Sequence, residues 1–202
     1  MTRLVLLRHG ETDWSRDKRI QGRSDIALSP AARAVLPGLR VPARLGIRQA
    51  WTSPLARCTE TAALLGWPDA RRDDRLAEMR WGDWEGRRLA DLRAEGGAAM
   101  QANEARGLDF RPAGGESPRE VMARLRPWLA EVAQRDVPTL AFSHRGVIRA
   151  LLALACGWDM RDKPPVRLQW DTLHGFELAP DGTPAPGEVN LPLERRDAQA
   201  SA

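Results

Sequence analysis

The stretch LVLLRHGET at residues 4–12 decides the fold. Its four leading apolar residues are typical of a central strand in a parallel sheet, which is buried on both faces. If the strand ends at about Leu7, then Arg8 and His9 emerge at its carboxyl end, where open α/β sheets bind their ligands. The stretch therefore predicts a site at that edge, although a polar exit from a core strand explains these residues, taken alone, equally well.

A later stretch, TLAFSHRG at residues 139–146, repeats this plan with an apolar run, a histidine beside an arginine, and a glycine. The chain holds three histidines, and two of them follow predicted strands with an arginine and a glycine beside them. Because the carboxyl ends of parallel strands share one edge of the sheet, we expect His9 and His144 to meet in one site.

Length and composition indicate one globular α/β domain. The 202 residues supply a substantial core without requiring two domains, so we predict a single domain over residues 1–202, with residues 193–202 as a frayed polar tail. Hydrophobic residues make up 43% and charged residues 29% of the chain, which excludes a largely disordered protein.

Charge and hydropathy restrict the expected partners. The formal net charge is +4, but acidic residues are spread among the 31 basic ones, so no tract for nucleic acid stands out and no such partner is expected. A site for a small anion explains the excess equally well. No stretch has the length of a signal sequence or a membrane helix, which predicts a cytoplasmic protein without a membrane partner.

Apolar periodicity and helix-start signals predict alternating strands and helices. Serine-proline pairs at 29–30 and 53–54 each open a helix, and a Ser-x-x-Glu capping box at 117–120 opens a third. Pro127 should bend or divide this third helix, and the glycines at 96–97 should break another helical stretch. The remaining predicted elements are strands at 47–52, 139–142, 167–170 and 173–178, and a helix at 147–156.

Two further segments supply candidate site residues. On the helix that follows residue 54, Arg57 and Thr61 lie four positions apart and share a face, with Arg57 in the first turn near the strand ends. Residues 76–86, LAEMRWGDWEG, are dense in aromatic and acidic side chains. Their irregular pattern predicts a loop of the kind that lines pockets.

Several short blocks together resemble one known family. They are RHGET at 8–12, QGR at 21–23, SPLAR at 53–57 with TA at 61–62, LAE at 76–78 with GDWEG at 82–86, GES at 115–117, and SH at 143–144. In this order they resemble the histidine phosphatase superfamily, which has the phosphoglycerate mutase-like fold. The size and block pattern are similar to those of its α-ribazole phosphatases and equally to those of its broad-specificity phosphatases. The resemblance implies a three-layer α/β/α sandwich with a mostly parallel central sheet and an active site at the carboxyl ends of the strands.

The chemistry of phosphate monoester hydrolysis suits these residues. It needs a nucleophile, cationic donors for the phosphoryl oxygens and an acid for the leaving oxygen. His9 is the expected nucleophile, forming a phosphohistidine, and Gly10 leaves room for close approach. Arg8 and Arg57 offer donor forks that match phosphate. His144, if protonated, adds a third donor, and a bound dianion would help to hold that proton.

Glu78 is the expected general acid, which protonates the leaving oxygen and then activates water. For this role its pKa must rise toward neutrality, and its apolar neighbours are suited to supply the desolvation. A structural ion pair with an arginine is the alternative for Glu78. The competing proton donors are Glu11, Glu85 and Glu116.

Two positions depart from the family pattern. The family commonly has asparagine six positions after the first histidine, where this chain has Ser15, and glycine after the second, where it has Arg145. A hydroxyl has a shorter reach than an amide, and a long cation near the pocket would clamp or crowd the substrate. For residues 21–23, a turn closing over the first helix competes with substrate contact. The residues expected to bind substrate are Gly10, Thr12, Ser15, Gln21, Gly22 and Arg145.

The expected function is hydrolysis of small phosphorylated metabolites, with a phosphate ester as substrate and inorganic phosphate as product. A cofactor-dependent phosphoglycerate mutase is a second hypothesis, although such mutases are usually longer. A non-catalytic phospho-ligand-binding protein is a third, and would be favoured if His9 or Glu78 were missing. A homodimer stays open.

Neither a metal nor another cofactor is expected, because two of the three histidines are assigned to phosphate and little remains to hold an ion. We predict that excess chelator leaves phosphate release from p-nitrophenyl phosphate intact. Loss of activity on chelation, restored by a divalent cation, would contradict this assignment.

Overall fold

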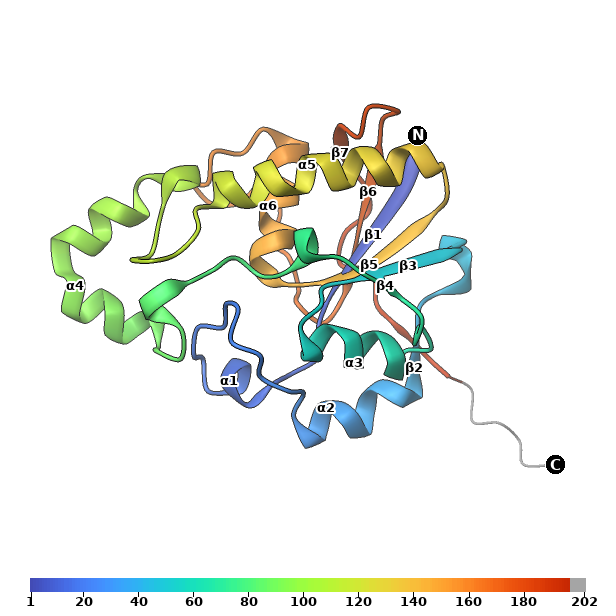
Figure 1. Ribbon diagram of the computed structural model, residues 1–202, viewed down its shortest axis with the longest axis horizontal. Helices are drawn as coiled ribbons and strands as arrows, with labels where there is room; N and C mark the ends of the chain where they lie inside the picture. Colours follow the sequence, from blue (N-terminus) through green and yellow to red (C-terminus); the bar gives the residue numbers. More distant parts are fainter. Residues whose placement is uncertain (197–202) are drawn as a thin grey trace.

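The computed structural model describes residues 1–196 and has a six-stranded sheet at its centre (Figure 1). The four parallel strands are β1 (Thr2–Arg8), β3 (Gln49–Thr52), β4 (Arg71–Arg72) and β5 (Thr139–Ser143). Two strands that are antiparallel to their neighbours complete it, β6 (Leu173–Leu178) and β7 (Pro184–Pro186). The strand order is β4-β3-β5-β1-β6-β7.

Helices cover both faces of this sheet. The α-helices are α1 (Asp13–Arg16), α2 (Pro30–Val35), α3 (Ala56–Leu64), α4 (Leu89–Glu104), α5 (Pro118–Arg135) and α6 (Arg145–Cys156). Residues of α2 and α3 pack on one face and residues of α5 and α6 on the other. Figure 1 shows α4 extending away from the sheet.

Alternating side chains of β1 join the two faces. Leu4 and Leu6 belong to the apolar cluster with α5 and α6, whereas Val5 and Leu7 belong to the cluster with α2 and α3. All four side chains are buried, as a strand covered on both faces requires. The predicted three-layer α/β/α sandwich with a mostly parallel sheet is therefore confirmed.

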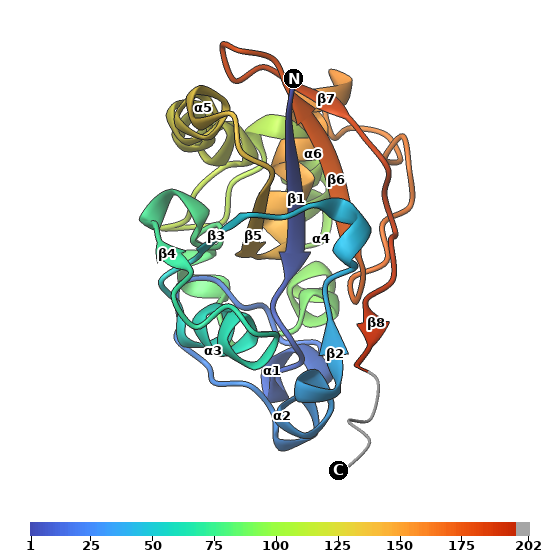
Figure 2. The same ribbon diagram turned by 90° about the vertical axis from the view of Figure 1, so that its right-hand side faces the viewer.

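The register of β1 and β5 places the functional edge. These strands pair in parallel with Arg8 opposite Ser143, and the backbone N–H of His9 donates to the Ser143 carbonyl at 3.0 Å. His9 and His144 therefore leave the sheet as neighbours. Figure 2 shows β1 running from the amino terminus down to this edge, with α1 and α2 below it.

Helix α3 begins later than predicted, at Ala56 rather than after Ser53. The predicted capping hydroxyl of Ser53 lies 2.7 Å from His144 Nε2, and Asp25 Oδ1 accepts instead from the Ala56 N–H at 2.8 Å. A long-range carboxylate thus replaces the local cap.

Helices α4 and α5 test the predicted breaks. Gly97 in α4 has φ 47° and ψ −128°, which confirms the break expected there. The capping box of Ser117 and Glu120 is present at the start of α5, but the helix continues past Pro127 as one element. Proline removes one backbone hydrogen bond. Buried side chains before and after Pro127, Trp128 among them, still pack the helix against the sheet.

The strand predicted at 167–170 is not formed. The side chain of Asn190 takes the place of a partner strand there, since its amide donates to the Arg167 carbonyl at 2.9 Å and accepts from the Gln169 N–H at 2.7 Å. The alternating polarity of residues 167–170 thus belongs to a loop, in which the Asn190 side chain hydrogen-bonds two backbone groups.

The tail prediction is wrong for the first residues of the predicted tail. A short strand β8 (Glu194–Arg195) pairs antiparallel with β2 (Leu39–Arg40), and the Arg196 N–H donates to the Gly38 carbonyl at 2.8 Å. Partners far away in the sequence thus order this polar segment. The rest of the predicted tail, residues 197–202, lies outside the described residues.

No helix within residues 1–196 combines the length and the apolar character that crossing a bilayer requires.

Candidate active site

Two imidazoles meet at the carboxyl edge of β1 and β5. The ring centroids of His9 and His144 are 5.2 Å apart with planes inclined by 58°, and both side chains are buried. The arrangement matches the expectation drawn from the two strand ends.

Hydrogen bonding sets the tautomer of His9. Its Nδ1 lies 2.7 Å from the Gly10 carbonyl, which only accepts, so Nδ1 carries the proton and Nε2 keeps a free lone pair. Burial, followed by the charges of Arg8 and Arg57, holds the pKa of His9 well below its ordinary value. The ring is thus neutral near pH 7, as a nitrogen nucleophile must be. The Thr61 hydroxyl fixes the neighbouring backbone by accepting from the Gly10 N–H at 2.9 Å.

His144 is held by a different set of groups. Its Nε2 lies 2.7 Å from Ser53 Oγ and 3.4 Å from Cys58 Sγ. Burial, and then the charge of Arg57, holds the pKa of His144 well below its ordinary value, so the ligand-free ring is neutral. Burial also raises the pKa of the Cys58 thiol to about 12. A dianion bound beside this ring would favour a second proton on it.

The arginines surround these rings. Arg57 is fully buried and donates to the carbonyls of Gly22 and Ser24 at 2.8 and 2.9 Å. The Nε atoms of Arg8 and Arg57 are buried and have no hydrogen-bond partner within the described chain. Burial lowers the pKa of Arg8, and the nearby Glu78 carboxylate opposes this. The site therefore keeps unused donors beside the histidines.

The carboxylate of Glu78 is buried beside the first turn of α6. Its Oε1 accepts from the Met79 N–H at 2.8 Å and its Oε2 from the Gly146 N–H at 3.1 Å. Burial raises the pKa of Glu78, although these two hydrogen bonds and the charge of Arg57 act against it. A carboxyl that keeps its proton to higher pH than usual is suited to general acid catalysis.

The competing carboxylates are engaged elsewhere. Glu11 is exposed and accepts from the Ser29 hydroxyl at 3.0 Å, and Glu116 forms an ion pair with Arg124 at 2.8 Å. These contacts give both side chains structural partners and favour Glu78 as the acid.

Glu85 organises the loop that carries the QGR block. Its carboxylate accepts from the backbone N–H groups of Arg23 and Ser24 at 2.9 and 2.8 Å. Although burial acts to raise it, the Ser24 hydroxyl and these N–H groups hold the pKa of Glu85 below its ordinary value. A Cβ on Gly22 would lie 1.9 Å from Glu85 Oε1, so only glycine is accommodated. Substrate contact by Gln21 and Gly22 stays a prediction.

Thr12 and Ser15 form a second capping box, at α1. The Thr12 hydroxyl accepts from the Ser15 N–H and also from the Gln21 side chain. Ser15 Oγ donates to the Thr12 carbonyl at 2.9 Å, so its proton is already used in this structure. Arg145 is exposed at the first position of α6, with its guanidinium 4.9 Å from the Trp170 ring centroid. Whether any of these groups binds substrate is likewise still a prediction.

A cleft of about 820 Å³ opens beside His9. One wall comes from the loop after β1 and the other from α2 and the loop before β6. Its lining includes Arg8, His9, Gly10, Glu11, Ser15, Ala32, Val35, Leu36, Trp170 and Thr172. Arg8 and His9 therefore border this cleft, whereas Arg57, Glu78 and His144 are not among its lining residues.

The third histidine lies apart from this site. His174 is buried in β6, and its Nδ1 accepts from the Asn190 N–H at 3.4 Å. Burial lowers the pKa of His174 to about 4, so the ring is neutral at physiological pH. This histidine therefore belongs to the core of the sheet.

Two residues beside the histidines and Glu78, Ser53 and Gly146, are not among the site residues predicted from the sequence. Ser53 belongs to the SPLAR block of the family pattern, which could indicate a site residue, but a serine-proline pair is also a helix-start signal. Gly146 gives no signal beyond its place after the second histidine. A Cβ there would lie 2.3 Å from Glu78 Oε1, so this glycine leaves the space that the carboxylate occupies.

Comparison with known proteins agrees with this geometry. A family model for the histidine phosphatase superfamily (branch 1) matches residues 4–184. Glucosyl-3-phosphoglycerate phosphatase of Mycobacterium tuberculosis (strain CDC 1551 / Oshkosh) is 36% identical over 168 residues, which cover 75% of this chain and 74% of that protein. A 2,3-bisphosphoglycerate-dependent phosphoglycerate mutase of Methylobacterium sp. (strain 4-46) is 32% identical over 200 residues, covering 92% and 96%.

Solved structures of related phosphatases have a similar fold over most of this chain. The native structure of mycobacterial glucosyl-3-phosphoglycerate phosphatase has a TM-score of 0.77 at 28% identity, covering 95% of this chain and 100% of that one. Its complex with inorganic phosphate has a TM-score of 0.76 at 28% identity, covering 95% and 98%.

The placement of Glu78 can be tested with Gly146→Ala. The new Cβ would displace the carboxylate, which ends a flexible side chain, while alanine is the better helix former. We predict that kcat/KM for an alkyl phosphate falls by about 10- to 100-fold, because a displacement of about 1 Å has effects of this size. Thermal melting should change little.

Gly38→Ala is the matched control, because a Cβ there meets nothing within 4 Å. Unchanged kinetics in Gly146→Ala would show that the carboxylate does not need the position described here.

Proposed function

The chain belongs to the histidine phosphatase superfamily, and on this premise we propose that it hydrolyses small phosphomonoesters through a phosphohistidine on His9. The observation that carries the proposal is the pair of buried imidazoles, 5.2 Å apart, beside arginine donors without partners and a buried carboxyl. Together they supply the nucleophile, the oxyanion donors and the acid that the reaction needs.

The first step transfers the phosphoryl group to the enzyme. The Nε2 lone pair of His9 forms a bond to phosphorus while the ester P–O bond breaks and its electron pair goes to the leaving oxygen. Glu78 gives its proton to that oxygen, so the alcohol departs neutral. Arg8, Arg57 and His144 bind the three remaining phosphoryl oxygens, where negative charge collects.

The second step returns the enzyme to its starting state. Ionised Glu78 takes a proton from water, and the water oxygen attacks phosphorus as the N–P bond breaks. The electron pair returns to His9 Nε2, and Glu78 is again protonated. The net reaction converts a phosphate ester and water into an alcohol and inorganic phosphate.

Hydrolysis is favoured over the mutase hypothesis by the phosphatases among the relatives. Chain length is not an argument, because the Methylobacterium mutase is matched over 96% of its own length. The earlier expectation that mutases are longer therefore does not separate the two functions here. Phosphate release compared with isomer interconversion on 3-phosphoglycerate distinguishes them directly.

The substrate class rests on the relatives. The mycobacterial relative acts, by its name, on glucosyl-3-phosphoglycerate, a small polar phosphate ester. We extend to this chain the broader class, a small phosphorylated metabolite, handled by one catalytic domain in the cytoplasm. The similarity to α-ribazole phosphatases and a homodimeric assembly stay predictions.

His9→Ala tests the nucleophile. We predict that turnover of p-nitrophenyl phosphate falls by about three orders of magnitude or more, and that acid-labile, base-stable phosphoryl labelling of the protein is lost. His174→Gln is the control, because the third histidine lies in the core and labelling should persist. A near-wild-type rate in His9→Ala would remove the proposed mechanism.

Glu78→Gln tests the acid. Activity on an alkyl phosphate should fall by about 100-fold or more, and activity on p-nitrophenyl phosphate should fall much less, because a good leaving group needs less protonation. In the wild type, the rate on the alkyl ester should decline as pH rises through the raised pKa of Glu78, since the acid form is then lost. The variant should lack this decline. Equal losses on both esters would assign the acid role to another residue.

A further inference from the structure

We propose that Arg124 is a positioning residue, which together with the Glu116 carboxylate holds the backbone around Glu78 so that its carboxyl reaches the leaving oxygen. This inference rests on the proposed phosphatase function. Arg124 is not among the site residues predicted from the sequence, and Glu116 is named there only as a competing proton donor.

The segment that carries Glu78 lacks regular secondary structure. A single 3-10 turn, Asp74–Leu76, precedes it, and residues 77–81 belong to no helix or strand. No ladder of backbone hydrogen bonds therefore fixes the position of Glu78. Buried backbone groups still need partners, so side chains must supply them.

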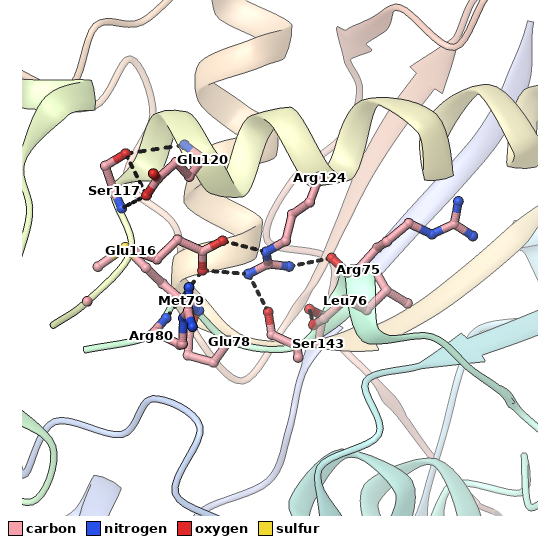
Figure 3. Close-up of polar contacts among 12 residues, drawn as sticks. Arg75, Leu76, Glu78, Met79, Arg80, Glu116, Ser117, Glu120, Arg124 and Ser143 are labelled. Atoms are coloured by element: carbon pink, nitrogen blue, oxygen red, sulfur yellow. Dashed lines mark hydrogen bonds and ion pairs between the residues drawn. The ribbon is translucent and has the colours of Figure 1, made fainter. Parts of the chain in front are cut away.

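Arg124 binds this segment on its amino-terminal side. It extends from α5, and its terminal nitrogens donate to the carbonyls of Arg75 and Ala77, the second at 2.6 Å (Figure 3). Ser143 Oγ donates to the carbonyl between them, that of Leu76, at 2.7 Å. Three successive carbonyls before Glu78 are thus fixed to α5 and β5.

Glu116 binds the segment on the other side of Glu78. Its backbone N–H donates to the Arg80 carbonyl at 2.9 Å, and its Oε2 accepts from the Arg80 N–H at 3.3 Å. The same carboxylate accepts from Arg124 Nε at 2.8 Å. One ion pair therefore links the two attachments that flank Glu78 (Figure 3).

The ion pair of Arg124 and Glu116 is largely buried. The side chains of Arg124 and Glu116 are 17% and 8% exposed, so removal of either partner leaves the other charge poorly solvated. Arg124 directs donors from three separate nitrogens to a carboxylate and two carbonyls, a spread that the single nitrogen of an ammonium does not match. By contrast, Arg119 lies on the same helix and pairs with Asp109 at the surface.

The test compares two leaving groups in Arg124→Met. An alkyl phosphate should lose about 10- to 100-fold in kcat, because a displaced acid protonates the leaving oxygen poorly. p-Nitrophenyl phosphate, which needs little protonation, should lose less than about threefold. Arg119→Met is the matched control and should leave both rates unchanged.

A double variant separates positioning from general loss of structure. In the Glu78→Gln background, Arg124→Met should cause no further loss on the alkyl phosphate, because its effect acts through the carboxyl already removed. Arg124→Lys should recover part of the loss, since the cation remains without the full set of donors. If Arg124→Met fails to fold, Glu116→Gln takes its place, because it keeps the side-chain volume and removes the ion pair.

Equal losses on both esters, or full additivity with Glu78→Gln, would overturn the proposal. His9→Ala, assayed alongside, keeps this outcome distinct from failure of the proposed function. Loss of labelling in His9→Ala with an unselective effect of Arg124→Met removes only the positioning role. Persistent activity in His9→Ala removes the phosphatase mechanism itself.

Discussion

The parallel pairing of β1 with β5 is the constraint on which the rest of the structure depends. Because Arg8 lies opposite Ser143, the chain leaves the two strands at the same level and presents His9 and His144 together. A one-residue slip would turn every side chain of β1 to the opposite face and separate the rings. The apolar side chains that fill both faces of the sheet fix this register, so the packing of the core determines the geometry of the site.

Burial then sets the chemistry of the groups that meet there. Desolvation disfavours charge, so it lowers the pKa of both histidines and raises that of Glu78. The same cause thus favours a neutral His9 imidazole and a carboxyl of Glu78 that keeps its proton to higher pH than usual. The guanidinium groups keep their charge, since arginine stays protonated in proteins. A dianionic phosphoryl group entering this site meets cations whose Nε donors are not already used.

The sequence predicted the layers and the meeting of His9 and His144 at one edge of the sheet, because apolar runs and the two histidine motifs depend on local order. It could not predict partners that come from distant segments. Asp25 caps α3 in place of Ser53, and Asn190 satisfies a loop that alternates in polarity like a strand. Arg124 escaped notice for the same reason, since an arginine on a helix gives no sign that it binds carbonyls some 50 residues earlier.

The central claim is that His9 attacks through Nε2, because the Gly10 carbonyl holds the proton on Nδ1. The most direct test is to trap the phosphorylated protein during turnover and assign the phosphohistidine isomer by NMR after locating the modified residue by mass spectrometry. We predict phosphorus on Nε2 of His9. Phosphorus on Nδ1 of His9, or on His144, would contradict it.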